Sequence, residues 1–262
     1  LWSLYFAGID YEPVVLRPAR PEDAIEPLAS SASHLVVTIG SAGPWLASRL
    51  PPALPVIATA VGHPASFEER QGGLVGTSHY VPPSRQLVFF RKVLPGLRRL
   101  GVLAHVADEN ALRLLQETQQ AAEPLGIEIA ASRIARAQDL TAAARRLLPE
   151  VDGLLLLGGH EIASEVQHVL EAAADWRRPL FAYSEEMVSR GAVAALYADR
   201  LALAEEVGPM ARQILTQGGT HSAFVQVRTL PIFKIALNVK AARALGLRLP
   251  YNLLVIANKI IR

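Results

Sequence analysis

The chain has no cysteine, little net charge and no long apolar run. Without thiols it can form no disulfide, no thiolate nucleophile and no cysteine metal site. The formal net charge is +2 and the basic residues are scattered, so the basic stripe of a nucleic-acid-binding protein is missing. The apolar run Leu154–Leu157 stops at Gly158-Gly159, far short of the roughly 18 to 20 residues of a membrane span. We therefore expect no nucleic-acid partner and no membrane-spanning helix.

Motifs of several enzyme classes are also missing. The paired glycines at 72–73 and 158–159 do not form a G-x-G-x-x-G fingerprint, and no phosphate-binding P-loop exists. The seven histidines are dispersed without H-E-x-x-H spacing, and no G-x-S-x-G nucleophile elbow is present. We expect no cofactor, no metal and no catalytic residue. A racemase that depends on cysteine is excluded by composition.

What the chain does contain is a large apolar fraction, 51% of its 262 residues, enough for two cores. Apolar strand-like runs alternate with helical segments through short loops, which is typical of parallel sheets with right-handed crossovers. The Gly-rich segment 71–83 is expected to be a loop, and Asn238 is expected to cap a helix. Strands are expected at 13–16, 35–39, 55–60, 100–105, 127–131, 151–157, 179–183, 192–198, 224–228 and 233–237. Helices are expected at 21–30, 44–49, 84–94, 110–125, 138–148, 162–174, 184–190, 200–216 and 238–245.

One local pattern recurs and organises the chain: a buried strand, a short loop and the start of a helix. It is clearest in the segment 98–113, RRLGVLAHVADENALR, and returns at 35–44, 56–64, 151–162 and 180–187. In open α/β folds, ligands bind where helix N-termini meet the carboxyl edge of a parallel sheet. The repetition predicts two lobes whose helix starts face a shared cleft.

The order of several motifs resembles one family. The matches include Ile39-Gly40-Ser41 at a strand end, Gly76-Thr77-Ser78 before a helix, and LLPEVDGLLLL at 147–157. They continue with PLFAYSEEMVSRGAVAALYAD at 179–199, the most specific stretch, and NVKAARALGLRL at 238–249. On these motifs the chain from about 35 to 257 resembles the substrate-binding proteins of ABC transporters, in the branch with tryptophan and tyrosine binders.

The resemblance implies an α/β fold with two Rossmann-like lobes and parallel sheets. This is the type I periplasmic-binding-protein architecture, with a ligand cleft between the lobes. We place lobe 1 at residues 1–97 with 193–228, and lobe 2 at 98–192 with 229–262. The family has a full strand and helix before the run PVVL at 13–16, and only about ten residues precede it here. We therefore expect the N-terminal part of lobe 1 to be incomplete.

In lobe 1, the resemblance places the ligand against loops that follow strands. The hydroxyl of Ser41 and the N–H groups beside it, Ala42 among the contact residues, would hold a carboxylate or another acceptor. Thr77 and Ser78 are expected to contact the ligand, and His63 stands where the family often has an aspartate. Alternatives stay open: Ser41 as a helix N-cap, His63 as a solvated loop residue, and 77–78 as part of a surface turn.

In lobe 2, the expected ligand contacts are Asn110, His160, Glu161, Ser184 and Glu186, and in the second segment of lobe 1 the expected contact is Asp199. Asn110 matches a family asparagine and could instead cap its helix. His160 and Glu161 replace a polar pair of the family, and Ser184 replaces a frequent aspartate, which weakens the case for a ligand ammonium there. Glu186 either compensates or only favours its helix N-terminus electrostatically. Asp199 is expected to face the cleft or the hinge.

The resulting hypothesis is a solute receptor rather than an enzyme. Two lobes close by hinge motion over a small polar ligand, an amino acid or related metabolite, and an ABC permease in the membrane reads the closed form. The expected location is periplasmic, or lipid-anchored at the outer face of the cytoplasmic membrane. Two alternatives remain: a ligand-sensing domain of a regulator with the same fold, and a two-lobed Rossmann-like enzyme.

Overall fold

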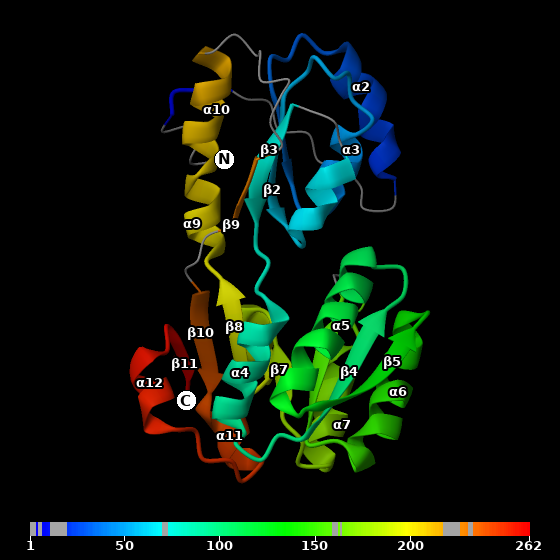
Figure 1. Ribbon diagram of the computed structural model, residues 1–262, viewed down its shortest axis with the longest axis vertical. Coiled ribbons are helices and arrows are strands. Elements are labelled where there is room, and N and C mark those ends of the chain that lie inside the picture. Colours follow the sequence, from blue (N-terminus) through cyan, green and yellow to red (C-terminus); the bar gives the residue numbers. More distant parts are fainter. Residues whose placement is uncertain are drawn as a thin grey trace. The chain divides into compact units, whose positions relative to one another are not determined.

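A computed structural model describes residues 4, 7–10, 20–69, 73–158, 162, 164–216, 226–229 and 233–262 of the chain. Contacts divide the chain into two compact units, Leu1–Tyr80 with Ala198–Ile232 (unit 1) and Val81–Tyr197 with Phe233–Arg262 (unit 2). Each unit holds one sheet with helices on its faces (Figure 1). The expected strand at 13–16 lies outside the described residues.

Unit 1 is built on a four-stranded sheet in the order β1-β2-β3-β9. All three pairings are parallel, in the registers Val36↔Val56, Val56↔Leu74 and Val75↔Gln226. The strands are β1 (Val36–Ile39), β2 (Val56–Val61), β3 (Leu74–Ser78) and β9 (Gln226–Thr229), and the helices are η1 (Pro21–Ala24), α2 (Ile25–Ser30), α3 (Ala42–Ala47), η2 (Pro64–Glu69), α9 (Arg200–Glu205) and α10 (Val207–Thr216).

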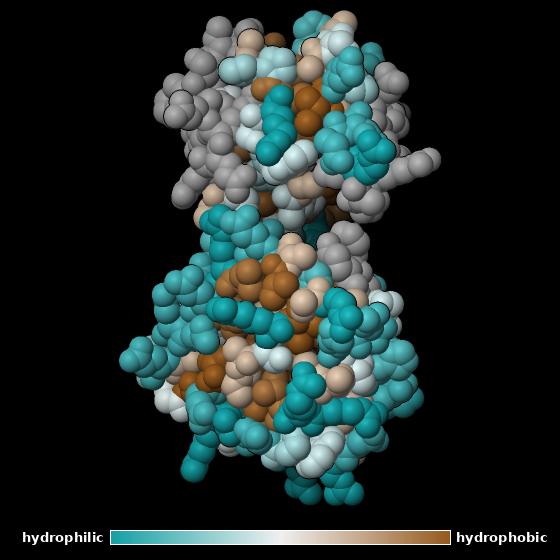
Figure 2. Space-filling view, turned by 90° about the vertical axis from the view of Figure 1, so that its right-hand side faces the viewer, coloured by the Kyte–Doolittle hydropathy of each residue, from teal (hydrophilic) through white to brown (hydrophobic). Residues whose placement is uncertain are grey.

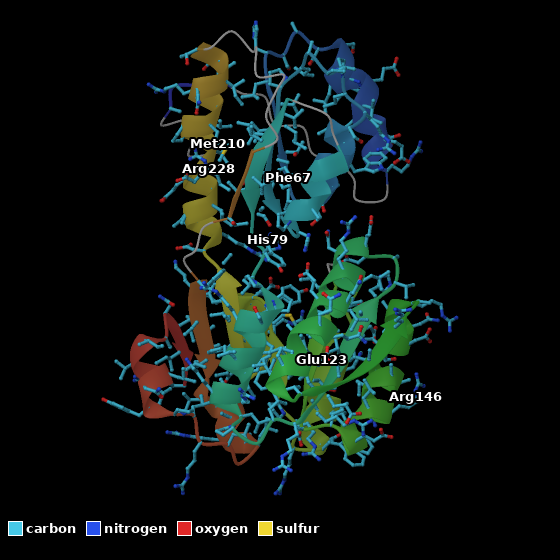
Figure 3. The ribbon with its side chains drawn as sticks, in the orientation of Figure 1. Phe67, His79, Glu123, Arg146, Met210 and Arg228 are labelled. Atoms are coloured by element: carbon cyan, nitrogen blue, oxygen red, sulfur yellow. The ribbon has the colours of Figure 1, made fainter. Side chains whose placement is uncertain are left out.

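Strand β2 explains why this sheet is covered on both faces. Its residues Val56 and Ala58 pack in one core with α3 and Phe67 of η2, whereas Ile57 packs in a second core with α10. Figure 3 labels Phe67 and Met210, which belong to these two cores. Because successive side chains of a strand point to opposite faces, an unbroken apolar run suits a strand that is buried on both.

Unit 2 is built on a seven-stranded sheet in the order β11-β10-β8-β7-β6-β4-β5. Parallel pairing joins β5 to β4, β4 to β6, β6 to β7, β7 to β8, and β10 to β11. The strands are β4 (Arg99–His105), β5 (Glu128–Ile134), β6 (Gly153–Leu157), β7 (Leu180–Ala182), β8 (Ala194–Ala198), β10 (Phe233–Asn238) and β11 (Lys259–Ile261). The helices are α4 (Pro83–Val93), α5 (Glu109–Ala122), η3 (Glu123–Leu125), η4 (Ala137–Asp139), α6 (Leu140–Leu147), η5 (Leu148–Glu150), α7 (Val166–Asp175), α8 (Glu185–Arg190), α11 (Val239–Ala244) and α12 (Tyr251–Ile256).

Most expected elements lie where the sequence places them, and Asn238 is confirmed as the N-cap of α11. Its Oδ1 accepts the Ala241 N–H at 2.8 Å. The prediction of a loop over the Gly-rich segment 71–83 is wrong for residues 74–78. These residues form β3, which lies between β2 and β9. The reason is close backbone approach: a Cβ on Gly76 would lie 1.8 Å from the carbonyl oxygen of Ala58. Glycine here marks strand contact and not a turn.

The division of the chain also differs from the expected boundaries at 97/98 and 192/193. Helix α4 groups with unit 2 because Phe90 stacks on Phe181 of β7, with ring centroids 4.4 Å apart. Strand β8 pairs with β7 in the sheet of unit 2. The Pro95-Gly96 pair is therefore a turn inside unit 2, between α4 and β4.

Candidate functional site

In unit 1, the predicted contact residues gather at one edge of the sheet. Ser41 and Ala42 follow β1, His63 follows β2, and Ser78 ends β3. These three strands are neighbours and run parallel, so their carboxyl ends lie together. The Ser41 Oγ accepts a hydrogen bond from the Gly62 N–H at 3.3 Å, which joins the first two loops directly. Unit 1 therefore presents polar groups at the carboxyl edge of its sheet.

The alternative role of Ser41 as a helix cap is wrong. Ser41 occupies the N-cap position of α3, but its backbone is helical (φ −70°, ψ −18°) and its side chain makes no cap hydrogen bond. An N-cap side chain normally needs an extended backbone to reach back to the helix. The exposed hydroxyl turns to the loop after β2 instead.

Thr77 and Ser78 shape the end of β2. The register between β2 and β3 shifts between Ala58 and Val61, and Ala60 has a left-handed φ of 55°. The Thr77 hydroxyl lies 2.7 Å from that of Thr59 and accepts the Ala60 N–H at 3.3 Å. The Ser78 hydroxyl donates to the Val61 carbonyl at 3.0 Å. Both hydroxyls are buried and hold a bulge, a feature that re-aims residues beside functional sites.

His63 is buried, at 7% exposure, so the alternative of a solvated loop residue is wrong. Its Nδ1 accepts the Ala65 N–H at 3.1 Å. The ring packs edge-on against Tyr80, with centroids 4.8 Å apart. These contacts fix the imidazole in place at the end of β2.

His79 follows β3 directly and lies at the same edge of the sheet (Figure 3). Its Nδ1 donates to the Ala60 carbonyl at 2.9 Å, and its N–H donates to the Val61 carbonyl at 3.0 Å. Burial lowers the pKa of His79 below its ordinary 6.5, and the positive charge of Arg200 lowers it further. The bond to Ala60 opposes this shift without cancelling it. The folded chain therefore favours a neutral His79.

We expect His79 to make unit 1 less stable in acid. Above pH 6.5 the histidine is neutral in both the folded and the unfolded chain, so its contribution to stability is fully present. As the pH falls from 6.5 through the lowered folded-state pKa, the unfolded chain takes up the proton first, and this contribution is lost. Urea unfolding at pH 7.5 and 5.5 should show a smaller acid loss for His79→Gln than for the natural chain. Equal losses in the two proteins would contradict this assignment.

In unit 2, the helix that follows β4 is capped by an unpredicted residue. Asp108 is the N-cap of α5, and its Oδ1 accepts the Ala111 N–H at 3.1 Å. Asn110 is the second residue of the helix, half-buried, so its alternative role as the cap is wrong. A contact between Asn110 and a ligand stays a prediction.

Ser184 and Glu186 lie at the start of α8, which follows β7. Ser184 is the N-cap, 9% exposed, and its Oγ accepts the Met187 N–H at 3.3 Å. Glu185 is engaged by the protein itself, since it accepts from the Tyr197 hydroxyl at 3.0 Å and pairs with Lys259 at 3.3 Å. Glu186 is exposed in the first turn. Its carboxylate can serve a ligand, the helix N-terminus or both.

Asp199 follows β8 and caps α9. Its Oδ1 accepts the N–H groups of Leu201 at 3.1 Å and Ala202 at 3.3 Å. The residue thus lies where the chain passes from unit 2 into unit 1. His160 and Glu161, the remaining predicted contacts, lie outside the described residues.

The sequence interpretation missed His105. This residue ends β4, is 7% exposed, and its buried Nδ1 has no hydrogen-bond partner in the described part of the chain. The register Ala104↔Leu157 brings it level with Gly158 at the end of β6. The hydroxyl of Tyr183, which follows β7, donates to the Gly158 carbonyl. The one sequence signal for a functional role at this position is that a polar residue, His105, ends an otherwise apolar run in β4.

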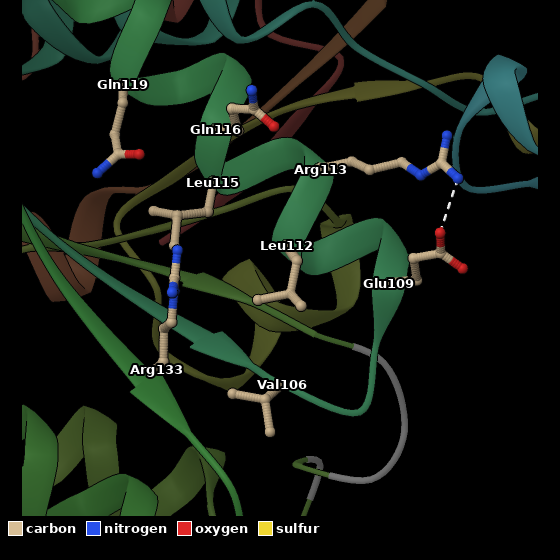
Figure 4. A pocket seen from close by; sticks show the side chains of 8 residues that line it. All are labelled: Val106, Glu109, Leu112, Arg113, Leu115, Gln116, Gln119 and Arg133. Atoms are coloured by element: carbon tan, nitrogen blue, oxygen red, sulfur yellow. Dashed lines mark hydrogen bonds and ion pairs between the residues drawn. The ribbon is translucent and has the colours of Figure 1, made fainter.

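A groove of about 460 Å³ lies elsewhere on unit 2, between α5 and the edge strand β5 (Figure 4). Figure 2 faces this side of the molecule, where hydrophobic residues interrupt the hydrophilic surface of unit 2. An ion pair of 2.7 Å joins Arg113 to Glu109. The groove is lined by Val106, Glu109, Leu112, Arg113, Leu115, Gln116, Gln119 and Arg133, none of them a predicted ligand contact.

The described residues offer neither a metal site nor a membrane-spanning helix. They contain no group of three or more His, Asp or Glu side chains placed to hold a metal ion. None of their helices combines the length and apolar character that a membrane crossing requires.

The parallel sheets of the two units, each with polar groups at its carboxyl edge, define a two-unit α/β binding-protein fold. A family model described as ABC transporter substrate binding protein matches residues 22–261, and the chain belongs to this family.

Individual proteins support the same class. A tyrosine-binding protein of Clostridioides difficile is 24% identical over 225 residues, which cover 84% of this chain and 65% of that protein's length. The structure of an ABC domain in complex with L-Trp from Streptococcus pneumoniae has a TM-score of 0.85 at 22% identity, covering 99% of this chain and 92% of that one. A conserved domain protein from Vibrio cholerae has a TM-score of 0.86 at 20% identity, with the same coverages. The type I periplasmic-binding-protein fold is thereby confirmed.

Proposed function

We propose that this chain is the solute-binding component of an ABC import system and binds an amino acid, in the first place an aromatic one. The observation that carries the proposal is the family match over residues 22–261. The tyrosine-binding relative and the L-Trp complex direct it toward aromatic amino acids. The ligand is held between the two units and closes them by hinge motion, a membrane permease receives it, and the protein acts outside the cytoplasm.

The polar groups at the sheet edges support a ligand with both an acceptor and a cationic end. The hydroxyl of Ser41 and the helix starts supply hydrogen-bond donors for a carboxylate. The exposed carboxylate of Glu186 suits an ammonium group. An α-amino acid carries both ends. Because the chain belongs to a family of substrate-binding proteins, a binding role is favoured over the alternatives of an enzyme or a regulator.

The test measures unfolding and shape with L-tyrosine and L-tryptophan. A ligand at about 100 times its Kd stabilises the folded state by about 2.7 kcal/mol, so the melting temperature should rise by several degrees. Solution X-ray scattering should show a smaller radius of gyration with ligand, as hinge closure requires. Unchanged melting and unchanged scattering across the amino acids would contradict the proposal.

A matched pair of serines at the two ends of α3 tests the site itself. Ser41→Ala should weaken tyrosine or tryptophan binding by roughly 2- to 10-fold, because one ligand hydrogen bond is lost. Ser48→Ala is the control, since the exposed Ser48 hydroxyl bonds the Trp45 carbonyl at 2.7 Å, at the other end of α3. Equal affinities in both variants would remove Ser41 from the site.

A further inference from the structure

His105 Nδ1, Thr141 Oγ1 and Arg178 Nε are buried in the described part of unit 2 without a hydrogen-bond partner, and of these three only His105 lies at the carboxyl end of a strand. Burying a polar atom without a hydrogen bond costs free energy, and such atoms are rare in folded proteins. Among the described residues, His105 Nδ1 has no partner although it is shielded from solvent. If this side chain only filled the core, a leucine would give a more stable fold because it has no polar atom to bury. The imidazole therefore points to a partner that arrives with a ligand.

The surroundings of His105 indicate what that partner is. The Asp108 N–H donates to the His105 carbonyl at 3.2 Å, so a single turn separates the histidine from the N-terminus of α5. The positive end of a 14-residue helix favours electron-rich groups. The nearby acids do not meet this need, because Asp108 caps the helix and Glu109 pairs with Arg113. An oxygen acceptor suits the position, with Nδ1 as the donor.

We propose that His105 is a ligand-binding residue whose Nδ1 donates a hydrogen bond to an oxygen atom of the bound amino acid. This inference rests on the proposed function and adds a specificity-determining contact to it. Gly158 follows β6 beside His105, and a Cβ there would lie 2.8 Å from the Ile162 Cδ1 and 3.5 Å from the His105 Cβ. The Ile162 side chain therefore packs closely against this glycine.

The test combines affinity and stability in His105→Leu, a variant of similar size without polar atoms. We expect L-tyrosine affinity to fall about 10-fold, the effect of one lost hydrogen bond. We expect the ligand-free melting temperature to stay level or to rise, because the natural Nδ1 has no partner to lose. A structural role would lower both. His168→Ala, on the exposed side of α7, is the control and should change neither.

Two probes identify the oxygen. If the loss is as large with L-phenylalanine, the contact is to the carboxylate; if it appears only with L-tyrosine, the contact is to the phenol. Either result supports the inference. Unchanged affinity in His105→Leu, or affinity and melting temperature falling together, overturns it while the proposed function stands. No binding of any amino acid by the natural chain overturns both.

Discussion

Gly76→Ala is expected to destabilise unit 1 by more than about 3 kcal/mol, above the usual range for overpacking. The added Cβ would lie 1.8 Å from the carbonyl oxygen of Ala58 and 2.7 Å from its carbonyl carbon. These are backbone atoms of the neighbouring strand, so no rotamer change relieves the clash. Ala58 and Gly76, which face each other in the pairing of β2 with β3, would have to move apart, and this would disrupt the middle of the sheet. Urea unfolding and the yield of soluble protein measure the effect.

Gly96→Ala is the matched control for this experiment. Gly96 has open space around the position of a Cβ and no left-handed φ. The same chemical change there should alter stability by less than about 1 kcal/mol. If Gly76→Ala unfolds at the same urea concentration as Gly96→Ala, then β2 and β3 do not pair as described, and 74–78 is a loop after all.

Phe90→Ala is expected to cost unit 2 about 3 to 5 kcal/mol. The ring is fully buried and stacks on Phe181, which is also fully buried, at an interplanar angle of 17°. Removing it leaves a cavity between α4 and β7 and exposes the remaining aromatic face. Chemical unfolding with a probe for the core of unit 2 gives the free energy of unfolding directly.

Val88→Ala on the same helix supplies the comparison. Val88 is 40% exposed, and alanine has the better helix propensity, so this change should cost less than about 1 kcal/mol. A Phe90→Ala protein as stable as Val88→Ala would mean that α4 does not pack on the seven-stranded sheet. The grouping of α4 with unit 2 would then fail.

The sequence predicted most of the fold because several strands are apolar throughout. The run GLLLL at 153–157 forms β6, all of whose residues are buried, as expected for a parallel strand covered on both faces. The run LVVTI at 35–39 also forms a parallel strand, although only Val36 of β1 is buried. The strand at 74–78 was not predicted because glycine, threonine and serine are common in turns. Its strand character depends on the neighbour: only contact with Ala58 reveals why Gly76 is needed.

The candidate site was predictable to a lesser extent. Strand ends and helix starts located Ser41, Ser78 and Ser184, because these positions follow from the alternation of elements. Hydrogen bonding could not be foreseen in the same way. Asp108 rather than Asn110 caps α5. That His105 Nδ1 has no hydrogen-bond partner among the described residues can be seen only in the three-dimensional structure. Partners that are distant in sequence decide these roles.

The division of the chain has a consequence for synthesis on the ribosome. Unit 1 completes its sheet with β9, and unit 2 completes its own with β10 and β11, although the central strands of both are made much earlier. Unit 1 therefore keeps an open strand edge until residues 226–229 leave the exit tunnel, and unit 2 keeps one until residues 233–261 leave it. Premature termination before β9 would leave both sheets incomplete at once and expose both units to chaperones and proteases.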